Sequence, residues 1–315
     1  RDPRELLFQF KRCMVHFAVD DARVKFCTKL DGKSSWFLPF DKGYNDGAGN
    51  PPNPNGIMTD YLWKEILTKD KLSRIIENYA QVVVEEDPET KKKSVKQIFP
   101  RYHQLDVVES LLSDVKANGI GKRYLIQHSA GSGKSNSISW LAHQLIGLDS
   151  VLVVTDRRIL DKQIRDNIKQ FMQVANTVAW AEHSGDLRDA IKDGKRIIIT
   201  TIEKFPYVVP DIGAKHKDNK FAVIIDEAHS GQSGRNSAQM NLALSGLAAE
   251  DEMDNEDKIN AMMEGRKLLS NASYFAFTAT PKNKTLETFG VPYPDGDEIK
   301  HRPYHSYTMK QAIQE

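Results

Sequence analysis

The sequence YLIQHSAGSGKSNSISWLAHQLI, residues 124–146, decides the fold. Its first four residues are typical of a buried strand, a Gly- and Ser-rich turn follows, and apolar residues then recur at helical spacing. Gly131 and Gly133 allow the turn to curl so that backbone N–H groups and the start of the helix face phosphate oxygens. The stretch therefore predicts a phosphate-binding loop, although His128 stands where the usual pattern has glycine.

Two side chains at the end of this loop fit a nucleotide bound with Mg²⁺. Lys134 can neutralise the β- and γ-phosphates, and the hydroxyl of Ser135 can hold the metal ion. A Gly/Ser-rich turn that merely precedes a helix is the alternative, and the register of strand, loop and helix argues against it. ATP is the expected ligand, and the loop residues expected to bind it are Ser129, Ala130, Gly131, Ser132, Gly133, Lys134 and Ser135.

Short apolar runs alternate with helical patterns downstream, which is typical of a parallel α/β sheet covered by helices on both faces. In such sheets ligands bind beyond the carboxyl ends of the strands, so chemistry is expected directly after each run. The predicted strands are YLIQ (124–127), VLVVT (151–155), RIIITT (196–201), FAVIID (221–226) and YFAFTAT (274–280).

The run that ends at residue 226 delivers two carboxylates to a strand end, in the sequence DEAH (226–229). Asp226 can hold the water shell of Mg²⁺, and Glu227 can polarise the attacking water. Four residues alone are weak evidence, but together with Lys134 they complete the set that ATP hydrolysis needs. We therefore predict Asp226, Glu227 and Lys134 as the catalytic residues.

Three further polar side chains are weaker candidates for the nucleotide site. Thr278 and Thr280 lie at the end of the last predicted strand and could sense the nucleotide through their hydroxyl groups, although a capping turn explains them nearly as well. Gln104 lies in a predicted helix upstream of the loop, where its amide could contact the adenine edge with two hydrogen bonds. An ordinary surface glutamine is the alternative for that residue.

Side chains at two other strand ends could contact a nucleic-acid backbone. Arg157 and Arg158 stand between a predicted strand and a predicted helix, where guanidinium groups can reach phosphates, with a solvated loop as the alternative. Thr200 and Thr201 offer hydroxyl groups at another strand end, which is a weakly specific signal. The formal net charge of +1 does not by itself indicate a nucleic-acid partner.

The first 84 residues are expected to form a smaller unit of mixed α/β structure. Strand-like runs flank a Gly-, Asn- and Pro-rich loop at 41–56, and a helical pattern follows. Residues 85–96, EEDPETKKKSVK, are charged with little to bury, which predicts a surface linker. Cys13 and Cys27 lack the spacing of a zinc site, and no apolar run is long enough for a membrane span, so a cytoplasmic protein is expected.

The order of Gln104, HSAGSGKS, TDRRILDKQ, TTIEKF, DEAH and TATP resembles the first RecA-like motor domain of superfamily 2 helicases. More narrowly, the chain resembles the restriction (R) subunit of type I restriction enzymes. That likeness is carried by RYHQ, the histidine that opens HSAGSGKS, the segment DRRILDKQ, and the upstream block MVHFAVDD, TKLDGKSSWFLPF, GAGNPP and TDYLWKEIL. The resemblance covers essentially the whole chain.

By this resemblance, residues 1–84 are the C-terminal part of a nuclease region, downstream of its catalytic carboxylates. Residues 85–96 are a linker, and residues 97–300 are the first RecA-like motor domain, which binds ATP. Residues 301–315 lead into a second motor domain. The family's arginine fingers belong to that second domain, which implies that this segment alone binds ATP poorly.

Carried over motif by motif, the resemblance gives Gln104 a contact with adenine and Asp226 the Mg²⁺ ion. His229, Thr278 and Thr280 would couple the nucleotide to the surface that grips DNA. The implied function is to couple ATP hydrolysis to translocation of double-stranded DNA and to cleave unmodified DNA away from the recognition site. The implied partners are double-stranded DNA and the modification and specificity subunits, in the cytoplasm of a bacterium or archaeon.

Two other functions fit the motor motifs. A generic DEAH-type helicase or translocase of superfamily 2 would need the same residues, but the FLPF and GAGNPP segments argue against it. A nucleotide-dependent DNA-binding module that has lost hydrolysis is the other, and the intact Lys134, Asp226 and Glu227 argue against that one.

Overall fold

The computed structural model describes residues 2–86, 90–145, 147–155, 168, 178–181, 183–202, 204–205, 218–226 and 271–315. The chain forms two compact units. The first contains Arg1–Val108 together with Thr308–Glu315, and the second contains Glu109–Tyr307. These units differ from the predicted division, which placed a linker at 85–96 and ended the motor domain at residue 300.

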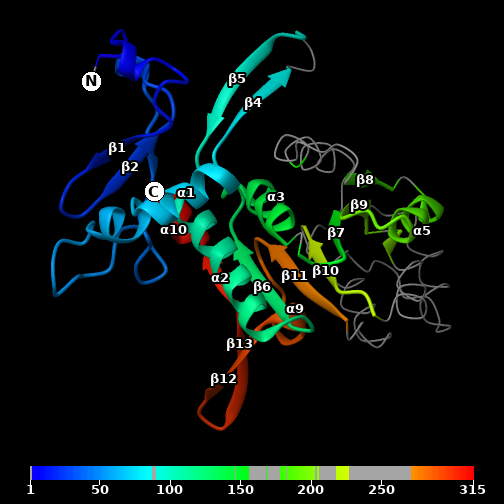
Figure 1. Ribbon diagram of the computed structural model, residues 1–315. Helices are drawn as coiled ribbons and strands as arrows, with labels where there is room; N and C mark the ends of the chain where they lie inside the picture. Colours follow the sequence, from blue (N-terminus) through cyan, green and yellow to red (C-terminus); the bar gives the residue numbers. More distant parts are fainter. Residues whose placement is uncertain are drawn as a thin grey trace. The chain divides into compact units, whose positions relative to one another are not determined.

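A seven-stranded sheet lies in the second unit, in the order β14-β6-β11-β10-β7-β9-β8. Every pair of neighbouring strands runs parallel, which confirms the predicted parallel α/β fold (Figure 1). The strands are β6 (Arg123–His128), β7 (Ser150–Thr155), β8 (Val178–Trp180), β9 (Ile197–Thr201), β10 (Phe221–Ile225), β11 (Ala272–Thr278) and β14 (His305–Tyr307).

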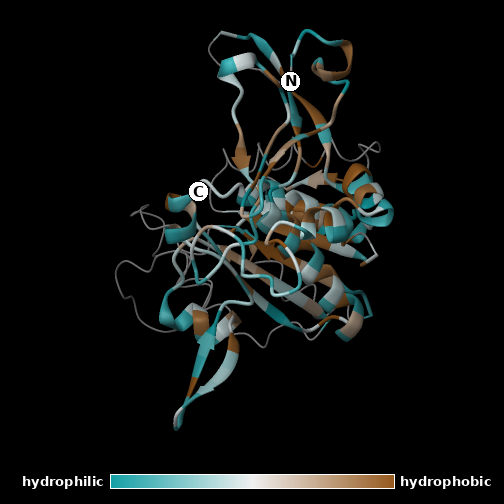
Figure 2. Ribbon diagram, turned by 90° about the vertical axis from the view of Figure 1, so that its left-hand side faces the viewer, coloured by the Kyte–Doolittle hydropathy of each residue, from teal (hydrophilic) through white to brown (hydrophobic). Residues whose placement is uncertain are grey.

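Burial explains why the apolar runs form the centre of this sheet. Every residue of β7, β9, β10 and β11 is buried, so both faces of these strands are covered. Figure 2 shows hydrophobic stretches in the strands of the sheet. Among the described residues of the unit, the helices are α3 (Lys134–Gln144), α5 (Ser184–Lys192), α9 (Asn283–Phe289) and the second part of α2 (Tyr102–Asn118), which begins in the first unit.

An antiparallel hairpin precedes the last strand of the sheet. It consists of β12 (Val291–Asp295) and β13 (Glu298–Arg302) and turns at Gly296, which has a φ of +63°. β14 then pairs with β6. Residues 301–302 thus end this hairpin, and residues 305–307 add an edge strand to the sheet. That residues 301–315 lead into a second motor domain stays a prediction.

The first unit contains a small antiparallel sheet in the order β1-β2-β3. Four aromatic rings pack together there, with centroids 5.5 to 6.3 Å apart, from Phe17, Phe26, Phe40 and Phe99. The elements of this unit are η1 (Leu6–Phe8), β1 (His16–Val19), β2 (Val24–Cys27), η2 (Gly32–Ser34), β3 (Leu38–Pro39), η3 (Leu62–Ile66), α1 (Lys69–Asn78), β4 (Gln81–Glu86), β5 (Lys93–Ile98) and α10 (Met309–Gln314).

The stretch predicted as a linker contributes to a two-stranded hairpin. β4 and β5 pair antiparallel from Gln81 opposite Ile98 to Glu86 opposite Lys93. Val83 on β4 is only 2% exposed. A charged composition did not reveal this pairing, because the hydrogen bonds between strands use backbone groups that every residue except proline carries. The hairpin belongs to the first compact unit.

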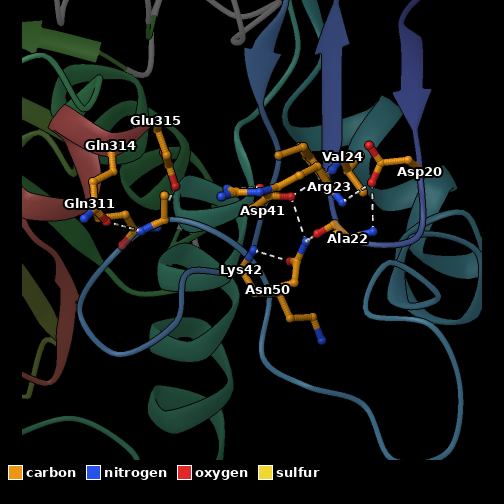
Figure 3. A network of polar contacts seen from close by, with 12 residues as sticks. Asp20, Ala22, Arg23, Val24, Asp41, Lys42, Asn50, Gln311, Gln314 and Glu315 are labelled. Atoms are coloured by element: carbon orange, nitrogen blue, oxygen red, sulfur yellow. Dashed lines mark hydrogen bonds and ion pairs between the residues drawn. The ribbon is translucent and has the colours of Figure 1, made fainter.

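The Gly-, Asn- and Pro-rich loop of the first unit is fixed by a buried carboxylate (Figure 3). Asp41 is 5% exposed and accepts hydrogen bonds from the Val24 amide at 2.8 Å and the Asn50 side chain at 2.7 Å, and an ion pair joins it to Arg23 at 3.0 Å. Asn50 in turn accepts from the Lys42 amide at 2.9 Å. The start of the loop is thereby tied to Asn50 and to β2.

The C-terminal helix α10 packs against the tip of this loop. The Thr308 hydroxyl donates to the carbonyl of Asp46 at 2.7 Å, and the Ala48 amide donates to Gln314 Oε1 at 3.0 Å. At Gly47, a Cβ atom would lie 2.5 Å from Gln314 Oε1. Glycine at this position therefore allows the close approach of helix and loop. None of the helices in the described part of the chain is long and apolar enough to cross a membrane.

Candidate nucleotide-binding site

The predicted phosphate loop, residues 128–135, connects β6 to α3 in the structure. Gly131 has a φ of +77° and Gly133 a φ of +79°, in the left-handed region that residues with a side chain rarely adopt. Gly133 is the N-cap of α3, and its carbonyl accepts from the Asn136 amide at 3.1 Å. The two glycines thus let the loop turn directly into a helix N-terminus, an arrangement that binds phosphate.

Lys134 lies inside this loop, with only 9% of its surface exposed. Its Nζ donates to the carbonyl of His128 at 3.3 Å and to that of Ser129 at 3.5 Å. These acceptors are neutral, and hydrogen bonds from a cation to a charged phosphate oxygen are stronger. The ammonium group is therefore placed where a bound phosphate can replace the loop carbonyls as its partner.

Three neighbouring strands bring the other predicted residues to the same edge of the sheet. β11 lies between β6 and β10. Thr278 pairs with Gln127, the residue before the loop, and Ala276 pairs with Ile225, the residue before Asp226. Because parallel strands end at the same edge, the phosphate loop, Thr278 and Asp226 follow one another along it, where ligands bind in such sheets.

The residues predicted to hold Mg²⁺ have suitable chemistry. Asp226 is 3% exposed, and its backbone amide donates to the carbonyl of Val154 at 2.9 Å, so the carboxylate starts from a fixed position. Ser135 lies half-buried in the first turn of α3. A carboxylate, a hydroxyl, phosphates and waters are the oxygen ligands that Mg²⁺ prefers. Within the described ranges, no group of three His, Cys, Asp or Glu side chains could hold a metal ion.

The predicted threonines occupy different environments. Thr278 is buried at the end of β11, whereas Thr280 is exposed in the turn that follows. Thr200 and Thr201 are 0% and 5% exposed at the end of β9, and Thr201 lies opposite Thr155 of β7. Within the described part of the chain, the hydroxyls of Thr155, Thr200 and Thr201 have no hydrogen-bond partner. Contact of Thr200 and Thr201 with a nucleic acid stays a prediction, and their burial does not favour it.

Five further predicted residues remain untested by the geometry of the sheet. Arg157, Arg158, Glu227 and His229 lie outside the described residues. Gln104 lies in the first turn of α2, in the first unit, and is 4% exposed. Its Oε1 accepts a hydrogen bond from the backbone amide of Arg101 at 3.0 Å, so this atom caps the helix. An adenine contact of Gln104 stays a prediction.

Two residues of β14 contact the phosphate loop, although no sequence motif marks them. The carbonyl of Tyr307 accepts from the Ser129 amide at 3.0 Å. His305 Nδ1 lies 2.9 Å from His128 Nε2. The strand has only three residues, HSY, and therefore lacks the apolar run that predicted the other strands next to the loop.

Comparison with known proteins agrees with an ATP site. The family of SWI2/SNF2 ATPases matches residues 103–315. The C-terminal part of a putative MpnIIP type I restriction endonuclease, from Mycoplasma pneumoniae, is 32% identical over 154 residues, which cover 43% of this chain and 73% of that protein. The type I restriction enzyme SsaAORF53P endonuclease subunit from Staphylococcus saprophyticus is 26% identical over 224 residues, or 68% of this chain. The match spans only 20% of the length of this second relative.

Solved structures that superpose on part of the chain include a helicase and an ATPase core. The UvsW helicase from bacteriophage T4 superposes with a TM-score of 0.42 at 12% identity, covering 71% of this chain and 64% of that chain. The Sulfolobus solfataricus SWI2/SNF2 ATPase core superposes with a TM-score of 0.40 at 17% identity, covering 68% of this chain and 36% of that chain. The family match takes in the phosphate loop, Thr278 and Asp226, and it extends over more than half of the sequence. The chain therefore belongs to the SWI2/SNF2 ATPases of superfamily 2, with relatives named as endonuclease subunits of type I restriction enzymes.

Proposed function

We propose that this chain contains the first motor domain of the restriction subunit of a type I restriction enzyme. In that role it couples ATP hydrolysis to translocation of double-stranded DNA, and the whole enzyme cleaves unmodified DNA away from its recognition site. The observation that carries the proposal is the sheet edge where the phosphate loop, Thr278 and Asp226 adjoin. The names of the bacterial relatives support the restriction role.

Each residue of the edge has a defined task in this proposal. The amides of residues 129–135 and the N-terminus of α3 bind the phosphates, and Lys134 exchanges its carbonyl partners for β- and γ-phosphate oxygens. Ser135 and Asp226 would hold Mg²⁺, which supplies positive charge at the transferring phosphoryl group. Glu227, the residue after Asp226, polarises the attacking water. Thr278 sits between the two halves of the site and reports the nucleotide state to the rest of the motor.

The remaining roles concern DNA and partner subunits. Gln104 contacts adenine, His229 and Thr280 couple the nucleotide to the surface that grips DNA, and Arg157 and Arg158 contact the DNA backbone. Modification and specificity subunits are the proposed partners, in the cytoplasm of a bacterium or archaeon. Residues 1–84 are the proposed C-terminal part of a nuclease region. The relatives named as restriction endonuclease subunits support the assignments of the nuclease region and of the partner subunits.

ATP turnover by the full-length protein, assembled with its candidate modification and specificity subunits, tests the proposal. The substrate is long circular DNA that carries the recognition site in unmethylated or methylated form. Strong turnover on unmethylated DNA alone, with cleavage at distant positions, is expected. Equal stimulation by any RNA would contradict the restriction role and favour a generic superfamily 2 helicase. Nucleotide-dependent DNA binding without turnover would favour a module that has lost hydrolysis.

Replacement of Lys134 tests the site itself. Lys134→Ala removes the cation that faces the β- and γ-phosphates, so translocation by the full-length protein is expected to be abolished. Displacement of a third DNA strand downstream of the recognition site measures translocation. Lys116→Ala is the matched control, because Lys116 is exposed in the last turn of α2, outside the loop, and the same charge is lost. Normal translocation by Lys134→Ala would overturn the assignment.

A further inference from the structure

The first position of the phosphate loop carries an imidazole ring where the usual pattern has glycine. His128 is 0% exposed. Its ring packs edge-on against Phe277 of β11 and Tyr307 of β14, with centroids 6.3 and 6.2 Å away. A ring this deeply buried between two strands cannot move without disturbing them, so its orientation bears directly on the backbone of the loop.

The ring of His128 has a polar partner on the edge strand. His305 Nδ1 lies 2.9 Å from His128 Nε2, and the two ring centroids are 5.0 Å apart. Two imidazoles form such a hydrogen bond when one nitrogen donates and the other accepts. The bond therefore restricts the tilt of the His128 ring, and which of the two nitrogens donates depends on the tautomers of the rings.

Backbone contacts connect this histidine pair to the phosphate-binding atoms. The carbonyl of His128 accepts from Lys134 Nζ at 3.3 Å, and the next amide, that of Ser129, donates to Tyr307 at 3.0 Å. β14 thus holds two successive residues of the loop, His128 through the His305 side chain and Ser129 through the Tyr307 backbone. His128 connects the two residues: its ring contacts His305, and its carbonyl accepts a hydrogen bond from Lys134. A change at His305 can therefore alter the position of Lys134.

We propose that His305 is a positioning residue of the nucleotide site, which acts through His128 to hold the phosphate loop and Lys134 in the shape that binds ATP. The inference rests on the proposed role of the loop. A loop that is already ordered binds a ligand more tightly than one that must be ordered on binding. Loss of the histidine pair therefore weakens nucleotide binding, whereas the hydrolysis step, which depends on Asp226 and Glu227, is changed less.

A pair of substitutions at residue 305 separates the hydrogen bond from the volume of the ring. His305→Leu keeps much of the volume and removes the polar atom, and His305→Asn keeps a polar atom at the position of Nδ1. His301→Leu on β13 is the matched control, because it removes a histidine of the same unit that is outside the loop. The dissociation constant of ATP and the kcat and KM of ATP turnover are measured on the full-length protein.

Loss of one hydrogen bond predicts that His305→Leu raises the dissociation constant and KM about three- to tenfold, with a smaller change in kcat. His305→Asn is expected to restore most of the affinity, and His301→Leu to leave it unchanged. Equal weakening by the asparagine and leucine variants would overturn the inference, and so would an unchanged affinity of the leucine variant. If His305→Leu does not fold, His305→Ala removes the same atom from the half-buried edge strand.

A double-mutant cycle tests whether His305 acts through His128. His128→Phe keeps a ring between Phe277 and Tyr307 but removes Nε2. In that background His305→Leu is expected to cause no further loss of affinity, since the two residues form one interaction. A full, additive loss would contradict action through His128. Lys134→Ala in the same assay separates the two proposals: if it leaves ATP affinity unchanged, the site itself is wrong, and if it alone lowers affinity, only the role of His305 is wrong.

Discussion

Gly131 shows how one residue in the phosphate loop depends on backbone conformation alone. A Cβ atom at this position would meet no heavy atom within 4 Å, yet the φ of +77° lies in the left-handed region. Gly131→Ala is therefore expected to lower the free energy of unfolding by about 1–2 kcal/mol through strain, and to weaken ATP binding as the loop relaxes. Urea unfolding and nucleotide titration measure the two effects.

The matched control for this substitution is Gly185→Ala in the first turn of α5. A Cβ atom there also meets open space, but the backbone is helical. Alanine has a higher helix propensity, so this variant is expected to keep or raise stability, by up to about 1 kcal/mol. If both alanine variants lost the same stability, strain at Gly131 would not be the cause.

The hydrogen bond between Tyr124 and Asp114 makes the stability of the second unit depend on pH. The Tyr124 hydroxyl donates to Asp114 at 2.7 Å, and this bond, together with Lys122, holds the pKa of the Asp114 carboxyl below its usual 3.8. Burial raises the pKa of the Tyr124 hydroxyl, so it stays a donor at neutral pH. A carboxyl whose pKa is lowered by folding stabilises the protein above its unfolded pKa, and the contribution is lost as the pH falls through the folded value.

Asp114→Asn tests this linkage. At pH 7 the variant is expected to be less stable than the parent chain, because the ionised carboxylate and its contacts with Tyr124 and Lys122 are gone. Below about pH 4, the usual range for an aspartate, the difference is expected to shrink, since the parent carboxyl becomes protonated too. Urea unfolding of both proteins at pH 7 and below about pH 4 measures this difference in stability. A difference that is constant over this range would show that the carboxylate does not cause it.

Much of the candidate site could be predicted at the scale of single residues, because its chemistry depends on residue types at fixed spacing. Gly131, Gly133 and Lys134 lie in the loop as predicted, and Asp226 follows a buried strand. The pairing of His128 with His305 could not be predicted in this way. It joins residues far apart in the sequence, and only the parallel pairing of two strands places them side by side.

At the scale of elements, the central strands were predictable and the edge strands were not. β7, β9 and β10 bury both faces and therefore need unbroken apolar sequence, which is easily recognised. β8 and β14 have three residues each and lie at the two ends of the strand order, where burial is incomplete. Their sequences, VAW and HSY, lack a recognisable run, so their place in the sheet follows from pairing with β9 and β6.

The contact between α10 and the loop at residues 43–49 gives a prediction at the same scale. A Cβ atom at position 47 would lie 2.5 Å from Gln314 Oε1, and a glutamine side chain can move away from it. Gly47→Ala therefore displaces Gln314 and removes its hydrogen bond from the Ala48 amide. The expected loss in the free energy of unfolding is about 1 kcal/mol, the typical net contribution of one hydrogen bond.

Gln314→Ala provides the control, because it removes the same hydrogen bond and leaves room for a methyl group at position 47. The double variant is then expected to be no less stable than Gln314→Ala alone. Urea unfolding of the parent chain, the two single variants and the double variant gives the coupling free energy between Gly47 and Gln314. If the two losses add, Gly47 is required for a reason other than the approach of Gln314.

At the scale of the whole molecule, the charge balance bears on how the motor can bind DNA. The sequence has 44 lysines and arginines against 43 aspartates and glutamates, so the overall field attracts a polyanion only weakly. The proposed binding of DNA would then depend on a few local contacts with phosphates. Each such contact releases counterions and adds about 0.9 to the slope of log K against log salt concentration.

The slope of log K against log salt concentration shows whether Arg157 and Arg158 contact DNA phosphates, because it changes with the number of such contacts. If both arginines contact phosphates, replacing both by alanine lowers the magnitude of the slope by about 1.8, in duplex DNA binding measured from low to physiological salt. Lys116→Ala with Lys192→Ala is the matched control, since both lysines are exposed in the second unit and the loss of charge is the same. Long-range attraction would change equally in the two double variants, whereas direct contacts are lost only in the first. Equal slopes would therefore remove Arg157 and Arg158 from the DNA interface and leave the ATP site untouched.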